Sequence, residues 1–178
     1  MHISVLLEEC LKYLNLKEED IVVDCTLGYG GHSSNILKRI KKGFLFAFDQ
    51  DSEAIKSSYQ RLKEISDNFE IIQNNFVNIK SELNKRNITE VDSVLYDLGV
   101  SSPQLDEDER GFSFHNDAKL DMRMDQTKSL SAYEVVNEYP YEKLTEIFYK
   151  YGEEKYASSI AKKIVKTREI KKIETTLE

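Results

Sequence analysis

A glycine-rich turn contains the residues whose types and spacing are best suited to chemistry. The turn is Asp24-Cys-Thr-Leu-Gly-Tyr-Gly-Gly-His32, and it follows the apolar run 21–23. Glycines let the backbone turn sharply and let a ligand approach where a Cβ atom would clash. Free N–H groups at the start of a following helix can bind a carboxylate or a phosphate. The turn therefore predicts a site for a nucleotide-like cofactor.

Two classes of cofactor are compatible with this turn. A dinucleotide favours the spacing G-x-G-x-x-G, but Ser33 stands where the third glycine would be. The doubled Gly30-Gly31 and the acid Asp24 suit instead a cofactor with an amino-acid tail. A nicotinamide-dependent oxidoreductase and a tight turn without any ligand remain as alternatives at this point.

Polar or aromatic residues also follow three further apolar runs. Asp49 ends the second run, where a carboxylate can accept hydrogen bonds from both ribose hydroxyls. Phe76 follows the third run and can lie against an adenine ring, although packing in the core is the alternative. Asp97 ends the fourth run, and Gln104 adds a polar group on the loop after it. In a parallel sheet such residues meet at the carboxyl ends of the strands.

The elements that must position these residues alternate along the chain. Short apolar runs predict strands at 21–25, 44–48, 69–73 and 91–96. Helical spacing and capping residues predict helices at 4–14, with Ser4 as cap, and at 33–40, 51–65 and 77–86. Alternation of this kind predicts an α/β fold with a parallel sheet and right-handed crossovers.

The pattern changes after the fourth predicted strand. Residues 98–124 show little periodicity, so we expect a loop there. The spacing of apolar residues then predicts three helices, at 131–137, 141–151 and 153–169. A helical region therefore follows the sheet domain, with a boundary near residues 100–130. Four strands leave one edge of the sheet unpaired, so we expect further strands to be absent and the chain to be a fragment.

Charge is unevenly distributed along the chain. The net charge of −7 disfavours binding to nucleic acid, because a phosphate backbone attracts lysine and arginine. From Lys155 to Lys172, however, seven residues are basic and one is acidic. This segment is either a solvated helix face or a surface that faces phosphates.

Composition also indicates the compartment. Two cysteines are too few for a disulfide framework, and they do not form a CxxC pair. The first residues lack the basic and apolar regions of a signal peptide, and no stretch approaches the roughly 18 apolar residues of a membrane helix. We expect a cytoplasmic protein without a membrane partner. His32 and His115 lack metal-ligand spacing, so no metal is expected.

Several longer motifs resemble those of one known family. They are Val5-Leu-Leu-Glu8, Asp24-x-Thr-Leu-Gly-x-Gly-Gly-His-Ser33, Asp97-Leu-Gly-Val-Ser-Ser-Pro-Gln-Leu-Asp106, Arg110-Gly-Phe-Ser-Phe114, Leu120-Asp-Met-Arg-Met-Asp125 and Tyr151-Gly-Glu-Glu154. The runs are similar to those of the RsmH (MraW) methyltransferases, from His2 to about Arg168, which is nearly the whole chain.

The resemblance implies a Rossmann-like class I methyltransferase sheet, with its first four parallel strands present, and a partial inserted helical domain. It implies that residues 1–110 bind S-adenosyl-L-methionine and that residues 111–178 face RNA. The cofactor-binding residues that it implies are Gly30, Gly31, His32, Asp49, Phe76, Asp97 and Gln104. Asp97 is also the candidate for positioning the substrate.

The activity that the resemblance implies is methylation of N4 of a cytidine in the decoding region of bacterial small-subunit ribosomal RNA. The expected partner is that RNA or the assembled small subunit, and the oligomeric state stays open. The family continues well beyond residue 178, so part of the fold and of the substrate site is expected to lie outside this chain. The alternative function is therefore an inactive RNA-binding or ribosome-assembly module.

Overall fold

The computed structural model describes residues 4–178, which divide into two compact units. The first unit ends at Gly99 and the second begins at Val100. We call them the sheet unit and the helical unit, and each is described by itself. The resemblance divides the chain differently, into a cofactor-binding part (1–110) and an RNA-facing part (111–178), and that division stays a prediction. Within residues 4–178, no helix has both the length and the apolar character needed to cross a bilayer.

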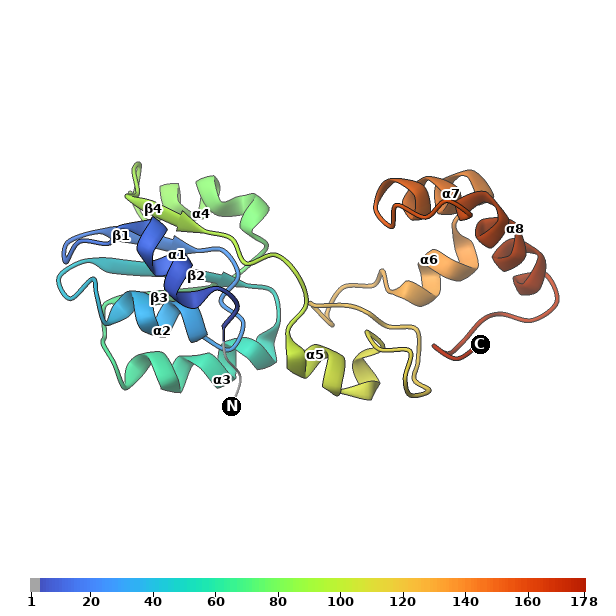
Figure 1. Cartoon of the computed structure of the whole chain (residues 1–178), viewed down its shortest axis with the longest axis horizontal. Coiled ribbons are helices and arrows are strands. Elements are labelled where there is room, and N and C mark those ends of the chain that lie inside the picture. The colour runs from blue at the N-terminus through green and yellow to red at the C-terminus, as the bar shows by residue number, and fades with distance from the viewer. Residues whose placement is uncertain (1–3) are drawn as a thin grey trace. The chain divides into compact units, whose positions relative to one another are not determined.

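The sheet unit is built on four parallel strands in the order β3-β2-β1-β4 (Figure 1). The strands are β1 (Ile21–Asp24), β2 (Phe44–Asp49), β3 (Phe69–Gln73) and β4 (Ser93–Leu95). In register, Val22 of β1 pairs with Leu45 of β2 on one side and with Ser93 of β4 on the other. The parallel sheet predicted from the alternating pattern is confirmed, and its central strand leads directly into the glycine-rich turn.

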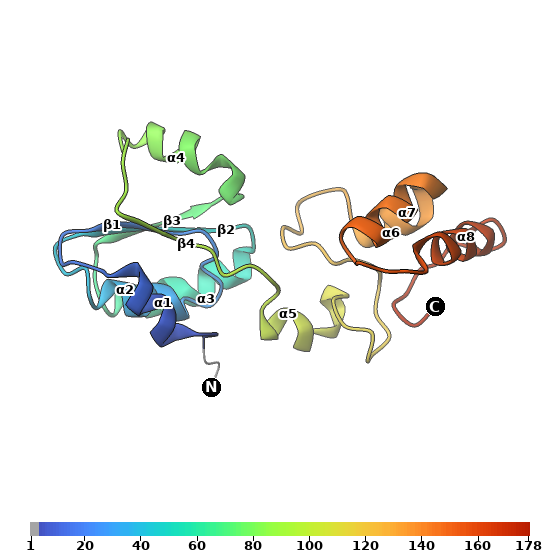
Figure 2. The ribbon, with the colours of Figure 1, turned by 45° about the horizontal axis from the view of Figure 1, so that its top comes forward.

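Helices cover both faces of this sheet (Figure 2). On one face lie α1 (Leu7–Leu14), α2 (Gly31–Leu37) and α3 (Ser52–Lys63), and on the other lies α4 (Ile79–Lys85). Because successive side chains of a strand point to opposite faces, Val22 packs with the first group of helices. Its neighbour Val23 packs with Leu83 of α4. The β-branched runs are thus buried on both faces, as the sequence predicts.

Several predicted helix limits differ from the observed ones. The first helix begins at Leu7, behind Leu6 in a left-handed conformation (φ 49°), so the prediction that Ser4 caps it is wrong. Asp51 does cap α3, because its side chain accepts a hydrogen bond from Glu53 N at 3.0 Å. Before α4, Asn75 accepts from Val77 N and opens a short 3-10 turn, so the helix predicted from Val77 begins later.

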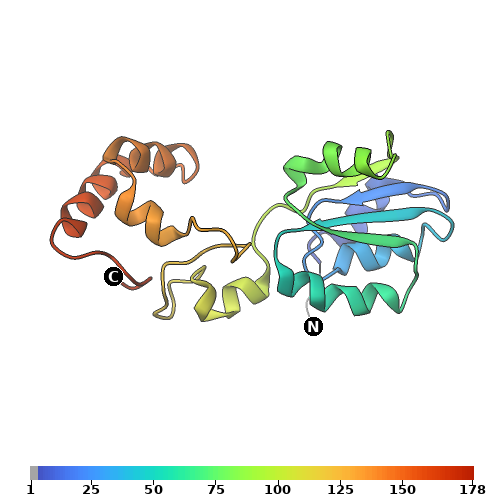
Figure 3. The same ribbon diagram turned by 180° about the vertical axis from the view of Figure 1, so that it is seen from behind.

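The helical unit contains five helical segments (Figure 3). They are α5 (Ser102–Asp106), the 3-10 turn η2 (Asp108–Arg110), α6 (Ala132–Glu138), α7 (Tyr141–Lys150) and α8 (Ala157–Arg168). Helices α7 and α8 pack against each other. The predicted loop at 98–124 is therefore wrong at residues 102–110. The missed signal is the capping box in which Ser101 and Gln104 exchange backbone and side-chain hydrogen bonds.

The last residues return to the middle of the helical unit. Lys119 and Thr175 form an antiparallel bridge. Leu120 N donates to Glu174 O at 3.1 Å, and Thr176 N donates to Ala118 O at 2.8 Å. These bonds join the last part of the predicted loop to the segment after α8.

Gly43 gives a test of how tightly the sheet unit is packed. A Cβ atom at this position would lie 2.0 Å from the backbone oxygen of Asp20. The same oxygen accepts from Phe44 N at 3.1 Å, where β2 begins beside β1. Because backbone must move to make room, we expect Gly43→Ala to lower the free energy of unfolding by about 1–3 kcal/mol in a urea titration.

The control is Lys41→Ala, two residues earlier, where the side chain is exposed. That variant should change the free energy of unfolding by less than about 0.5 kcal/mol. Equal stability of the two variants would show that the close approach at Gly43 is unimportant.

Candidate functional site

The turn between β1 and α2 joins the ends of three strands. Gly28 N donates to Asp49 Oδ2 at 2.7 Å, which ties the turn to the end of β2. Asp97 N donates to Thr26 Oγ1 at 2.8 Å, which ties it to the residues after β4. The carboxyl ends of β1, β2 and β4 therefore meet at this turn, the place where open α/β sheets bind ligands.

Asp24 holds the turn from inside. Its side chain is fully buried, Oδ2 accepts from Ser33 Oγ at 2.6 Å, and Oδ1 accepts from Thr26 N at 3.0 Å. Burial raises the pKa of Asp24, while the hydrogen bonds from Ser33 and Thr26 oppose that rise in pKa. Through Ser33, the carboxylate fixes the first turn of α2 against the end of β1.

Asp49 presents its carboxylate at the end of β2. Oδ2 accepts from Gly28 N, and Oδ1 accepts from Asp51 N at 2.9 Å. Burial raises the pKa of Asp49, and the backbone donors, Asp51 first, oppose that rise. An ionised carboxylate has about four acceptor positions, and the backbone N–H groups of Gly28, Asp51 and Gln50 point at Asp49. Asp49 therefore keeps the capacity to accept a hydrogen bond from a ligand hydroxyl.

His32 lies between the N-terminal segment and the end of β4. The side chain is buried, and Nε2 lies 3.1 Å from Val5 O. Its Nδ1 lies 3.6 Å from Asp97 Oδ2. The carboxylate of Asp97 is 46% exposed, so it faces solvent and the buried ring at once. A ligand at this edge would therefore meet Asp97 first and His32 behind it.

The protein's own packing accounts for the first of the paired glycines, Gly30. Gly30 caps α2 with φ 76°, and a Cβ atom there would lie 3.1 Å from Ser58 Cβ. At Gly31, a Cβ atom would lie 1.9 Å from Ser4 Oγ. Gly30 therefore needs glycine whether or not a ligand is bound, whereas at Gly31 the Ser4 hydroxyl can rotate away from an added Cβ atom. A role in cofactor binding for either glycine stays a prediction.

Phe76 is held by an aromatic neighbour that the sequence analysis missed. Its ring meets the Tyr96 ring edge-on, at 5.4 Å between centroids and 82° between planes. The Tyr96 hydroxyl in turn shares a hydrogen bond with the buried Cys25 thiol. An aromatic residue directly before the strand-ending Asp97 was the available signal. Cys25 follows β1, Tyr96 follows β4, and Phe76 lies in the turn after β3, so the three side chains link these three strand ends.

Gln104 lies in the helical unit, whereas the other six predicted cofactor residues lie in the sheet unit. It is buried, and its Oε1 accepts from Ser101 N at 3.0 Å. This bond gives Gln104 a structural role at the start of α5. The other six residues belong to the sheet unit, at the turn, at α2 or after the strands.

Two motifs of the helical unit hold its central loop in place. Arg110 is 4% exposed and donates through Nη2 to the carbonyls of Arg123 and Met124, at 3.1 and 3.3 Å. Asp121 receives two side-chain bonds from Arg123, at 2.9 and 2.6 Å. Spacing alone is typical of a solvated loop here, but the structure buries Arg110. Its carbonyl partners are 13 and 14 residues away, so no local pattern reveals this burial.

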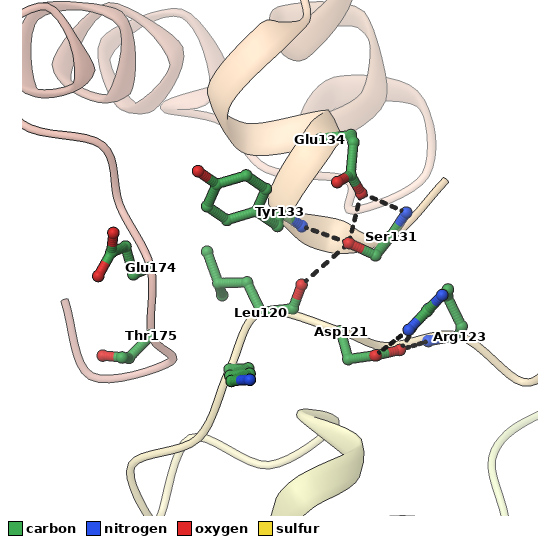
Figure 4. Close-up of a pocket in the computed structure, with 9 residues that line it drawn as sticks. Leu120, Asp121, Arg123, Ser131, Tyr133, Glu134, Glu174 and Thr175 are labelled. Atoms are coloured by element: carbon green, nitrogen blue, oxygen red, sulfur yellow. Dashed lines mark hydrogen bonds and ion pairs between the residues drawn. The ribbon is translucent and has the colours of Figure 1, made fainter. Parts of the chain in front are cut away.

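A cavity of about 510 Å³ opens beside these motifs (Figure 4). It is lined by Lys119, Leu120, Asp121, Arg123, Ser131, Tyr133, Glu134, Glu174 and Thr175. Its polar walls are engaged in local structure, because Ser131 and Glu134 form the capping box of α6 and Asp121 pairs with Arg123. The cavity was not predicted from the sequence, and its lining indicates no ligand class.

The basic segment Lys155–Lys172 is only partly a free surface. Arg168 donates to the carbonyls of Val136 and Tyr139, both at 2.6 Å, and so closes the end of α6. Lys172 lies 5.5 Å from the centre of the Tyr133 ring. All six lysines of the segment are exposed, namely Lys155, Lys162, Lys163, Lys166, Lys171 and Lys172, and Lys171 pairs with Glu178.

A parallel sheet in the order β3-β2-β1-β4, a glycine-rich turn after β1 and an acid at the end of β2 define a Rossmann-like fold of the class I methyltransferase type. The model of the MraW methylase family matches residues 1–178. The chain belongs to that family.

Curated relatives agree with this assignment. Relatives from Exiguobacterium sibiricum and Mesoplasma florum are each 56% identical, over 177 and 170 residues. One from Oceanobacillus iheyensis is 53% identical over 176 residues. All three are called ribosomal RNA small subunit methyltransferase H. The matches cover 99%, 95% and 98% of this chain but 57%, 55% and 54% of the relatives, so the chain spans just over half their length.

The two cysteines give a test of the site's interior. Cys25 is buried, and burial raises its pKa from 9.0 to about 11, whereas Cys10 is partly exposed. Because the thiolate is the nucleophile, this rise in pKa lowers the reactive fraction of Cys25 roughly a hundredfold at pH 8. We expect iodoacetamide to label Cys10 well before Cys25 in the folded chain, as read by peptide mass spectrometry.

The control is labelling of the chain unfolded in urea, where both thiols are exposed and should react at similar rates. Equal labelling of Cys10 and Cys25 without urea would contradict the burial of the Cys25 thiol.

Proposed function

We propose that this chain binds S-adenosyl-L-methionine at the turn after β1 and takes part in methylating N4 of a cytidine in the decoding region of small-subunit ribosomal RNA. The observation that carries the proposal is the Asp49 carboxylate, anchored beside Gly28 and still able to accept a hydrogen bond from a ribose hydroxyl. Family membership and the names of the relatives support the choice of RNA.

The residues present fit this cofactor. At Gly28 (φ 50°), the nearest atom to an added Cβ would be Thr26 O at 3.9 Å, so the backbone is open to a close approach. Asp49 would hold the ribose, and Phe76 would lie against the adenine. Asp97, with Gly30, Gly31 and His32, would bind the amino-acid tail, and Gln104 stays a cofactor residue that the family resemblance predicts. When bound, the cofactor supplies an electrophilic methyl group on a sulfonium.

A dinucleotide fits less well. Its third glycine would permit close packing of helix on strand, but this chain has Ser33 at that position, fully buried and bonded to Asp24 at 2.6 Å. The serine therefore replaces the helix–strand contact with a hydrogen bond. This difference favours the cofactor with an amino-acid tail over a nicotinamide cofactor.

The chemistry asks the chain mainly for orientation. The N4 amine of cytosine is a poor nucleophile because its lone pair is delocalised into the ring, so alignment of nitrogen, methyl and sulfur is required. The amine must also lose a proton to an acceptor or to water. Asp97 is the proposed positioning residue, because its backbone is fixed through Thr26 and its exposed carboxylate lies beside His32.

Asp49 gives the first test of this function. Asp49→Ala should weaken binding of S-adenosylhomocysteine by about 1.5–3 kcal/mol, or roughly 10- to 150-fold, because hydrogen bonds to a charged group are lost. Isothermal titration calorimetry measures the dissociation constant. Glu90→Gln, an exposed acid of the same unit, is the control and should leave it unchanged.

Asp49→Asn is the more conservative variant, since the amide keeps one acceptor oxygen for one of the two backbone bonds but loses the charge. An unchanged dissociation constant in both Asp49 variants would show that this residue does not bind the cofactor. Binding of NADH without binding of S-adenosylhomocysteine would favour the oxidoreductase.

The reaction itself is tested with cofactor that carries a labelled methyl group. Small-subunit RNA and assembled small subunits are incubated with this chain and, in parallel, with the longer Exiguobacterium sibiricum relative. We expect N4-methylcytidine, identified by mass spectrometry of the digested nucleosides. Cofactor binding without methyl transfer by this chain would favour the RNA-binding or assembly module. If neither protein transferred the methyl group, the proposed methyltransferase activity would be wrong.

The lysines of α8 provide a test of RNA binding. We propose that Lys162, Lys163 and Lys166, all exposed, face phosphates. Replacing all three with glutamine should weaken binding of single-stranded RNA. It should also reduce the slope of log affinity against log salt by about 0.7 for each lost contact. Fluorescence anisotropy of a labelled oligonucleotide gives both quantities.

The matched control is a triple variant in the sheet unit, Lys41→Gln, Lys56→Gln and Lys80→Gln. These lysines are also exposed, so the change in net charge is the same. Equal effects of the two triple variants would indicate general electrostatic attraction rather than a contact surface on α8.

A further inference from the structure

We propose that Phe114 is a stacking platform for one base of a single-stranded RNA segment. The proposal rests on the RNA partner of the proposed function and names a contact within it. Phe114 lies in the segment 111–117 of the helical unit, which we call the platform loop. Neither the predicted cofactor residues nor the lysines of α8 include it.

The first observation is the exposure of an entirely apolar ring. All eight phenylalanines lie within residues 4–178, and among them Phe114 alone is exposed, at 73%. An exposed tyrosine keeps its hydroxyl in water, whereas a phenyl ring has no polar group to solvate. A single exposed apolar residue is common on protein surfaces, so the surroundings of Phe114 must decide whether it has a role.

The second observation is that the platform loop is fastened on both sides of the ring. Gly111 turns with φ 69°, and a Cβ atom there would lie 2.5 Å from Lys119 O. Asn116 donates to Asp108 Oδ1 at 2.9 Å, and its carbonyl accepts from Thr176 Oγ1 at 2.8 Å. The loop is therefore hydrogen-bonded to two other segments of its own unit and packed closely against a third at Gly111, while the apolar ring remains in solvent.

The third observation is a second ring beside the first. The His115 ring lies 4.9 Å from the Phe114 ring between centroids, tilted by 36°. His115 N donates to Ser113 Oγ at 3.2 Å, which fixes the backbone between the two rings. Adjacent aromatic and histidine rings are the groups on which proteins stack unpaired bases. Holding them in place before binding lowers the entropy cost of association.

Charge decides which part of an RNA this loop can take. The acids near it in sequence are Asp106, Glu107, Asp108, Glu109 and Asp117. This concentration of carboxylates repels phosphates, so a backbone contact is disfavoured. A base is uncharged and presents a π-face whatever its identity. The loop therefore suits a base stacked on Phe114, with the phosphates bound elsewhere.

Tryptophan substitution offers a direct test because the chain contains no tryptophan. Phe114→Trp creates a single reporter, and stacking of a base should quench its emission as an unlabelled single-stranded RNA oligonucleotide is added. Tyr149→Trp is the matched control, since Tyr149 is 71% exposed in the same unit. Its emission should change little over the same titration.

Phe114→Ala supplies the energetic test. Its affinity for the oligonucleotide should fall roughly 5- to 150-fold, the range expected for one stacked base. The factor should be the same at low and high salt, because stacking releases no counterions. Phe114→Tyr, which keeps a ring, should restore most of the affinity.

The outcomes separate this inference from the proposed function. If the chain bound RNA but the emission of Phe114→Trp were not quenched and Phe114→Ala kept its affinity, Phe114 would not be a stacking platform. The proposal of an RNA partner would still stand. Absence of RNA binding by the unaltered chain would overturn both. Emission of Phe114→Trp that changes with protein concentration, but not with RNA, would show that the ring contacts a second copy of the chain instead.

Discussion

The buried carboxylate of Asp24 is the interaction on which the candidate site depends. It accepts hydrogen bonds from Ser33 Oγ at 2.6 Å and from Thr26 N at 3.0 Å. These bonds fix the turn after β1 and the first turn of α2. Thr26 in turn accepts from Asp97 N. The same turn also donates from Gly28 N to Asp49. Without Asp24, the turn to which both Asp49 and Asp97 are bonded would no longer be held in place.

The sheet unit follows closely from the sequence because its signals are local. A β-branched apolar run such as 21–23 is suited to a strand buried on both faces, and the structure buries Val22 and Val23 completely. Asp51 is a strong helix cap, and it caps α3 as predicted. The predicted meeting of Asp49 and Asp97 near the turn also follows from topology, since parallel strands bring their carboxyl ends to one edge.

The helical unit was harder to predict because long-range bonds organise it. Arg168 appears in the sequence as one more charge on a basic segment, yet it closes the end of α6 through carbonyls 32 and 29 residues away. Arg110 likewise becomes buried through distant carbonyls. No local pattern distinguishes such an arginine from a solvated one. The capping box of Ser101 and Gln104 was a local signal, but the absence of apolar periodicity around it concealed the short helix.

The place of β4 in the sheet links the fold to the chemistry. Among the described residues, β4 pairs with β1 on one side, and its other edge carries unpaired backbone groups. Tyr96 and Asp97 follow this strand directly, and they are 49% and 46% exposed. Tyr96 supports Phe76, and Asp97 is the proposed positioning residue. Any strand that pairs with the free edge of β4 would therefore also lie beside Tyr96 and Asp97. Pairing at this edge would extend the sheet and shape the site at the same time.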